Sequence, residues 1–170
     1  SNGDFSAGTD GWKEYGADSG GQASETAIVT RVQGGVLEFY RQAGAGQAVV
    51  FQETGVSVPA GGPVVARFKL GNTMGVRRRV SVLLHDQDFS DLSVCTFTLE
   101  ANSSLQSYGI QTHAGQAWSN ATLSVYAANE GSDGGYYQLD DVAVTYDLGA
   151  NAEASARTIC ENPTWPGGGG

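Results

Sequence analysis

Tyr137-Gln138-Leu139-Asp140-Asp141-Val142-Ala143-Val144 alternates apolar and polar side chains, as expected of a β-strand that is buried on one face. Tyr137 and Leu139 share one face, whereas Val142 and Val144 have the opposite parity. Because side chains alternate with a period of two, one buried face cannot hold both pairs unless an extra residue is inserted. We therefore predict a β-bulge at Asp140-Asp141, which re-aims the side chains that follow it.

Short runs of the same kind recur along the chain, separated by turns rich in Gly, Asn, Asp and Pro. No stretch of convincing length has the period of a helix. Many short strands with frequent turns are typical of two antiparallel sheets packed face to face. The sequence thus predicts an all-β, two-sheet antiparallel β-sandwich (jelly roll) with little or no helix. We expect its strands at residues 27–32, 36–41, 48–58, 64–70, 76–85, 92–100, 105–112, 122–128 and 136–146.

The composition is that of a turn-rich secreted protein. Glycine accounts for 25 of the 170 residues, and charged residues for only 16%. The net charge of −9 repels phosphate backbones and anionic lipids, so we expect neither nucleic-acid binding nor membrane insertion. We expect a secreted or cell-surface protein. Its β-sandwich domain should span residues 1–147, and a C-terminal arm or linker residues 148–170.

The chain has two cysteines, Cys95 and Cys160, whose spacing matches no zinc motif. In an oxidising compartment they can pair and tether the C-terminal arm to the sandwich, which is the interpretation we favour. The alternative is a buried thiol at one position and a free or intermolecular thiol at the other. Sequence separation does not decide between them, because a disulfide requires a specific geometry.

The two ends of the β-rich region carry motifs of a known family. The chain opens with Asn2-Gly3-Asp4-Phe5, followed by Gly11-Trp12, and closes with the Tyr137–Val144 segment quoted above. Together these motifs resemble the first and last strands of galactose-binding-like jelly-roll domains, a group that contains many carbohydrate-binding modules of secreted glycosidases. The resemblance covers residues 2–146. It implies a non-catalytic extracellular β-sandwich with a structural calcium ion.

The resemblance also implies where calcium would bind, between the N-terminal segment and the final strand. Calcium takes six to eight oxygen ligands, which commonly combine carboxylates with backbone carbonyls. The matching positions are Asp141 as the first choice of carboxylate, with Asp140, Asp4, Asn2 and the Gly34 carbonyl. Many members have Glu directly after the Phe, where this chain has Ser6, so one ligand charge is missing. The alternative is that Asp140 and Asp141 only accept hydrogen bonds within a turn.

Sugar rings stack on exposed aromatic side chains, so the aromatic residues must be divided between core and surface. Trp118 lies in a polar turn and is either a lid on one end of the sandwich or a ligand platform. Our ligand-binding candidates are Trp118, Tyr136 and Tyr108, with Arg41, Gln52 and Asn129 as hydrogen-bonding partners. Tyr15, Tyr40 and Phe89 are further candidates. The apolar periodicity assigns to the core Phe5, Trp12, Phe39, Phe51, Phe68, Phe97 and Tyr126.

The case for catalysis is poor, because His85 and His113 are isolated and no nucleophile or phosphate-binding motif is present. We therefore expect no enzymatic activity. The leading hypothesis is a carbohydrate-binding module that recognises a polysaccharide or glycan. The alternative is a structural subunit of an extracellular filament, tube or adhesin, in which copies of the chain assemble by adding the terminal arm as a strand.

Overall fold

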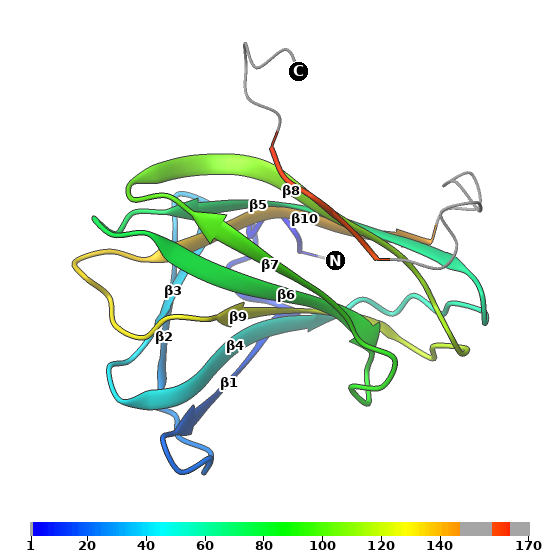
Figure 1. Cartoon of the computed structure of the whole chain (residues 1–170), viewed down its shortest axis with the longest axis horizontal. Coiled ribbons are helices and arrows are strands. Elements are labelled where there is room, and N and C mark those ends of the chain that lie inside the picture. The colour runs from blue at the N-terminus through cyan, green and yellow to red at the C-terminus, as the bar shows by residue number, and fades with distance from the viewer. Residues whose placement is uncertain (1, 147–157, 164–170) are drawn as a thin grey trace.

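The structure, a computed structural model, describes residues 2–146 and 158–163. All regular structure in these residues is β, without a helix, and two sheets pack face to face (Figure 1). All pairs of neighbouring strands are antiparallel. The predicted β-sandwich is confirmed. The described part of the chain has no helix long and apolar enough to cross a membrane.

The strand order follows from these pairings. The five-stranded sheet runs β1 (Lys13–Asp18), β4 (Ala45–Glu53), β9 (Ala121–Ala127), β6 (Arg78–Asp86), β7 (Ser93–Leu99). The six-stranded sheet runs β11 (Ile159–Glu161), β8 (Ser103–His113), β5 (Pro63–Asn72), β10 (Tyr137–Tyr146), β3 (Val36–Arg41), β2 (Ile28–Gln33).

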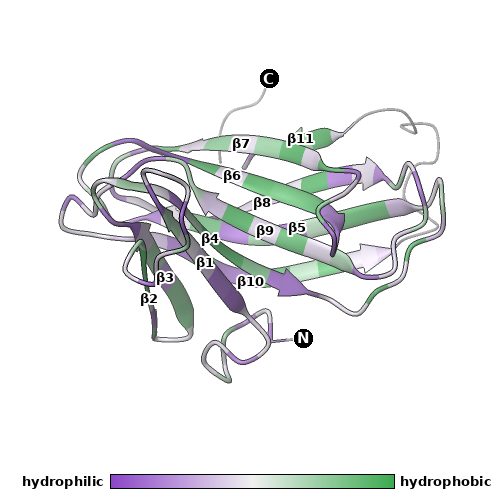
Figure 2. Cartoon of the chain, turned by 90° about the horizontal axis from the view of Figure 1, so that it is seen from below, coloured by the Kyte–Doolittle hydropathy of each residue, from purple (hydrophilic) through white to green (hydrophobic). Residues whose placement is uncertain are grey.

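The predicted runs correspond to β2 through β10, but three details differ. β4 ends at Glu53, and beyond it only Val58 returns to pairing, in an isolated bridge with Trp118. β1 was not predicted because it is an edge strand of mostly exposed residues without apolar alternation, and Figure 2 shows it as largely hydrophilic. β11 was also not predicted, since three residues are too few for a periodic pattern.

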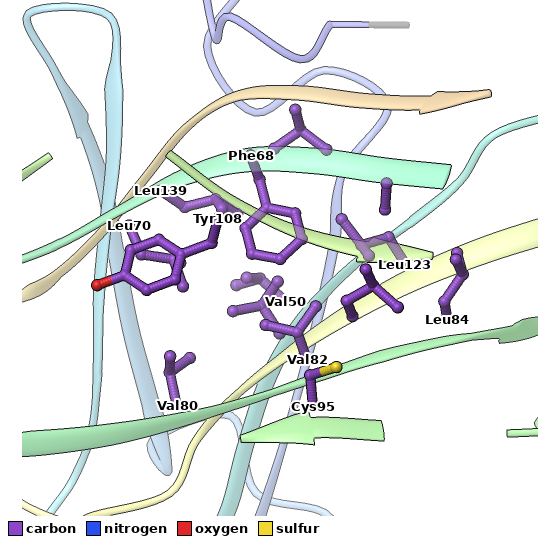
Figure 3. Packing of buried hydrophobic residues seen from close by; sticks show 14 of the residues in the cluster. Val50, Phe68, Leu70, Val80, Val82, Leu84, Cys95, Tyr108, Leu123 and Leu139 are labelled. Carbon is purple, nitrogen blue, oxygen red and sulfur yellow. The ribbon is translucent and has the colours of Figure 1, made fainter. Parts of the chain in front are cut away.

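The core lies between the sheets and is built from alternate residues of each strand. Val80, Val82 and Leu84 of β6 face Phe68 and Leu70 of β5, and all five are buried (Figure 3). The core prediction holds for the buried residues Phe5, Phe39, Phe68 and Phe97, whereas Trp12 is half-buried and packs against the core edge. It is wrong for Phe51 and Tyr126, which are half-buried on the opposite side of their sheet.

The β10 bulge is confirmed by the register. Asp140 pairs with Lys69 and Ala143 with Arg67, so three steps along β10 match two steps along β5. Within the bulge, Asp141 has a backbone φ of 48°, a strained conformation for a residue with a Cβ. The N-terminal segment packs on this bulge, where the Val142 N–H donates to the Gly3 carbonyl over 2.9 Å. A Cβ at position 3 would overlap the Val142 carbonyl oxygen, so only glycine fits there.

β11 extends the six-stranded sheet at the edge formed by β8 (Figure 1). Cys160 of β11 forms a disulfide with Cys95 of β7, which is the edge strand of the other sheet. The disulfide therefore links the two sheets along one open side of the sandwich. Within the expected arm of residues 148–170, only residues 158–163 are described, and the remainder of that expectation lies outside the described residues.

Candidate functional site

The structure places Trp118 in the interior. Its side chain is only 2% exposed, and its indole N–H donates to Asp91 Oδ2 over 2.8 Å. The backbone of Trp118 also pairs with Val58 in both directions. A ring buried in this way offers no free face to a sugar, so the structure favours the lid on one end of the sandwich over the ligand platform.

Two more of the predicted ligand residues point into the core. Tyr108 is 8% exposed and packs edge-on against Phe97, and burial raises the pKa of its hydroxyl. Gln52 is 3% exposed and shares the inward side of β4 with Val50. Neither side chain presents a free face on the sheet surface, because the parity of each strand turns it inward.

The other three predicted ligand residues lie at one end of the sandwich, but two of them have structural roles. Asn129 Oδ1 accepts a hydrogen bond from the Arg79 backbone N–H over 2.7 Å. Arg41 donates to the Gly46 carbonyl, and the Arg41 carbonyl accepts from the N–H of Gly131. Tyr136 is half-buried on the outer face of the six-stranded sheet. The six predicted residues therefore do not form one site.

Four aromatic side chains do gather on the outer face of the five-stranded sheet. We call this surface the aromatic face and define it by Tyr15, Phe51, Phe89 and Tyr126. Tyr15 and Phe89 are 41% and 44% exposed, and the other two are half-buried. The core prediction for Phe51 fails because β4 is apolar on both sides, whereas on β9 Tyr126 shares its parity with the polar Thr122 and Ser124. The signal that separates them is their parity relative to the buried Val50 and Val125.

The strand register sets the layout of the aromatic face. One row across the sheet runs Tyr15, Val49, Tyr126, Ser81 and Thr96, and the next runs Lys13, Phe51, Ser124, Leu83 and Val94. Neighbouring strands lie about 4.8 Å apart, so the two tyrosines of the first row are about 10 Å apart at the backbone. The hydroxyls of Ser81 and Thr96 are 3.1 Å from each other at the end of that row. The first row therefore carries two aromatic rings, followed by two hydroxyl groups on β6 and β7.

Phe89 is held in place although it lies in a loop. Its ring stacks on His85 with centroids 4.4 Å apart, and it meets Phe51 edge-on at 6.5 Å. Its backbone has φ of 60°, a conformation that is uncommon for a residue with a Cβ. Asp91 in the same loop accepts hydrogen bonds from the Gly115 N–H and the Trp118 indole. The Phe89 ring is thus exposed and yet held in place by its neighbours, on a residue whose backbone is strained. Exposed apolar side chains and strained backbone both occur often at binding surfaces.

His85 supports Phe89 from below and is itself fully buried. Its Nδ1 is 2.6 Å from the Asp86 carbonyl oxygen and its Nε2 is 2.9 Å from Ser124 Oγ. Burial lowers the pKa of the imidazole, against the smaller opposing effects of the Asp86 carbonyl and of the Asp86 and Asp88 charges. The ring is therefore fixed on both edges and favoured in its neutral form.

The segments expected to hold calcium lie together, and the two aspartates have different surroundings. Asp141 is half exposed, and its Oδ2 pairs with Lys69 Nζ over 2.8 Å. Asp140 Oδ1 is buried and has no hydrogen-bond partner among the described residues. Burial, followed by the charges of Asp141 and Asp4, raises the pKa of Asp140, although an Asp141 N–H and Lys69 oppose this.

The remaining expected ligands are partly used by the N-terminal loop. The side chain of Asn2 bonds to the backbone of residues 7, 8 and 10, and Asp4 Oδ1 accepts from the N–H and hydroxyl of Ser6. Gly34 is exposed, and the Asp4 carbonyl lies near the adjacent Gly35. No cluster of three His, Cys, Asp or Glu occurs in the described residues. A buried carboxylate oxygen without a hydrogen-bond partner is the kind of ligand that a hard cation such as calcium takes.

No protein-family model and no curated protein matches the sequence. Among solved structures, a CBM4 protein matches with a TM-score of 0.57 and 18% identity, over 84% of this chain and 99% of that chain. A family 29 carbohydrate-binding module matches with a TM-score of 0.51 and 14% identity, over 82% of this chain and 84% of that chain. This chain has the jelly-roll fold of carbohydrate-binding modules.

The same jelly roll also occurs inside a larger enzyme. An arabinose-bound α-L-arabinofuranosidase matches with a TM-score of 0.62 and 13% identity, over 85% of this chain. The match covers only 25% of the enzyme's chain. At these identities the likeness establishes the fold, and the function has to be argued from the side chains.

Proposed function

We propose that this chain is a non-catalytic, extracellular carbohydrate-binding module that binds a polysaccharide on the aromatic face. The observation that carries the proposal is the fixed, exposed ring of Phe89 beside Phe51, in the same face as Tyr15 and Tyr126. Aromatic rings present flat apolar surfaces to the C–H faces of a sugar, and the hydroxyls of Ser81 and Thr96, which lie beyond Tyr126 in the same row, can bond to its hydroxyl groups.

The test is affinity electrophoresis of the whole chain against soluble xylan, barley β-glucan and galactomannan. We expect Phe89→Ala and Tyr15→Ala each to weaken binding to the best of these by about 1 kcal/mol, roughly fivefold in Kd. Val76→Ala is the matched control, because Val76 is 38% exposed and lies outside the aromatic face. Unchanged binding by both aromatic variants would exclude the aromatic face as the site.

The disulfide supports the extracellular part of the proposal. Disulfides persist in oxidising compartments and are rare in the cytosol, and Cys95 and Cys160 form one here. We expect the protein recovered from its native source to lie outside the cell and to resist alkylation until it is reduced. Native protein with two alkylatable thiols would argue against this location.

We also propose a structural calcium ion held by Asp140 and by backbone carbonyls of the N-terminal segment. The support is the buried, unpartnered Asp140 Oδ1, which a cation would satisfy. In EGTA, Asp140→Asn should raise the midpoint of thermal unfolding at pH 7, because it removes a buried charge whose pKa is raised. Calcium should then stabilise the wild type and Asp141→Asn but not Asp140→Asn. Calcium that stabilises none of the three would rule the site out.

The alternative function, a subunit that assembles through its terminal arm, remains testable by light scattering. β11 pairs with β8 of its own chain and is held there by the disulfide. We therefore expect a monomer in calcium and in EGTA. Filaments or tubes in either condition would favour the structural-subunit function.

A further inference from the structure

A second group of aromatic and polar side chains lies on the outer face of the six-stranded sheet, on the opposite side of the sandwich from the aromatic face. Arg31 of β2, Glu38 of β3 and Gln138 of β10 are register neighbours across three strands. Tyr40 of β3 and Tyr136, which directly precedes β10, lie next to this row with ring centroids 5.5 Å apart. The group is independent of the aromatic face and of the function proposed for it.

A buried carboxylate fixes the polar part of this group. The Glu38 side chain is only 7% exposed. Its Oε1 accepts from Arg31 Nε over 2.9 Å, and its Oε2 accepts from Gln138 Nε2 over 3.1 Å. Among the described residues, Nε is the only side-chain atom of Arg31 that donates a hydrogen bond, so the two terminal nitrogens of its guanidinium remain available. That side chain is 47% exposed.

The guanidinium also fixes the aromatic part. Arg31 Cζ lies 4.1 Å from the centroid of the Tyr136 ring, within the range of a cation–π interaction. Tyr136 and Tyr40 are both half-buried and tilted by 58° to each other. Their edges, the guanidinium nitrogens and the Gln138 amide form one preorganised surface of apolar and hydrogen-bonding groups. Preorganised side chains lose little entropy when a ligand binds.

The charge balance selects the class of ligand. Glu38 neutralises Arg31, and the chain as a whole carries a net charge of −9. An anionic sugar would gain little from the paired guanidinium and would be repelled by the rest of the protein. We propose that Arg31, Tyr40, Tyr136 and Gln138 form a second binding site, which takes uncharged sugar residues. A chain with sites on both sheets can bridge two polysaccharide chains.

The test separates the two surfaces by mutation. The background is the double variant Tyr15→Ala/Phe89→Ala, which disables the aromatic face, and the probes are soluble xylan, barley β-glucan, galactomannan and polygalacturonate. We expect this background to retain binding to at least one neutral probe and none to polygalacturonate. Adding Tyr136→Ala or Arg31→Lys should weaken that residual binding by about twofold to tenfold. Arg67→Lys is the matched control, because Arg67 is 58% exposed on the same sheet but pairs with Glu161.

Three outcomes would overturn the second site. The first is that the background variant binds none of the neutral probes. The second is that Tyr136→Ala and Arg31→Lys leave residual binding unchanged while both retain the wild-type unfolding midpoint. The third is that the background variant binds polygalacturonate. The conservative Arg31→Lys change keeps the test valid if Tyr136→Ala does not fold. Loss of binding in the background variant alone would support the aromatic face and exclude the second site.

Discussion

Glu161 of β11 and Arg67 of β5 form an ion pair across the intervening strand β8, where Gly109 has no side chain to separate them. A Cβ at position 109 would lie 3.0 Å from Glu161 Oε2 and 3.1 Å from an Arg67 nitrogen. Both side chains are partly exposed, so the pair itself contributes at most about 1 kcal/mol. The ion pair matters more for the strand register, because it favours the alignment in which Glu161 of β11 lies opposite Gly109 of β8.

The disulfide is the stronger tether of β11. It closes a loop with a sequence separation of 65, which restricts the unfolded chain. We expect Cys160→Ala to lower the free energy of unfolding in urea by about 2–4 kcal/mol. Cys95→Ala/Cys160→Ala is the control for the free thiol left at the buried Cys95. If both variants were as stable as the wild type, the disulfide would have no role in holding the sheets together.

Gly3 is required for the N-terminal segment to pack on the β10 bulge. Gly3→Ala would force its Cβ into the Val142 carbonyl, which is backbone and cannot rotate away. We expect a loss of about 1–3 kcal/mol in the free energy of unfolding. Gly75→Ala is the control, because no atom lies within 4 Å of a Cβ built there. Equal losses in the two variants would contradict the packing argument.

His85 should make the stability of the protein sensitive to mild acid. Burial lowers its folded pKa below the ordinary value of 6.5, so the unfolded chain binds the proton more readily. The stability that depends on a neutral His85 is fully present above pH 6.5, and it is lost as the pH falls towards the pKa of His85 in the folded protein. Urea unfolding at pH 7.5 and pH 5.0 should show a smaller decrease for His85→Gln than for the wild type. The same decrease in both would show that other groups dominate.

Trp118 should matter for stability and not for ligand binding. Trp118→Phe removes the hydrogen bond from the indole N–H to Asp91. Asp91 still accepts hydrogen bonds from the backbone N–H groups of Gly115 and Gln116. We expect the free energy of unfolding to fall by about 1–3 kcal/mol. In affinity electrophoresis, the polysaccharide that binds the wild type best should slow the variant as much as it slows the wild type. Weaker binding in a variant that retains the fold would return Trp118 to the ligand site.

The extent of what could be predicted is clearest at the bulge. The parity conflict between Leu139 and Val142 needs only the two-residue period of a strand, so the inserted residue was evident without a structure. The sequence did not show which of the two aspartates has an unpartnered carboxylate oxygen. In the structure Asp141 forms an ion pair with Lys69 of the neighbouring strand β5, and Asp140 Oδ1 has no partner among the described residues. That contact joins residues far apart in the chain.

The amino-acid sequence by itself determined the all-β class, most of the strands and the bulge, since each follows from local alternation and turn residues. Only the tertiary structure decided which rings face a ligand. Phe51 lies on a strand that is apolar on both sides, so its direction is set by how the two sheets pack. The burial of Trp118 and the fixing of Phe89 likewise depend on Asp91, through contacts between loops that only the folded sandwich brings together.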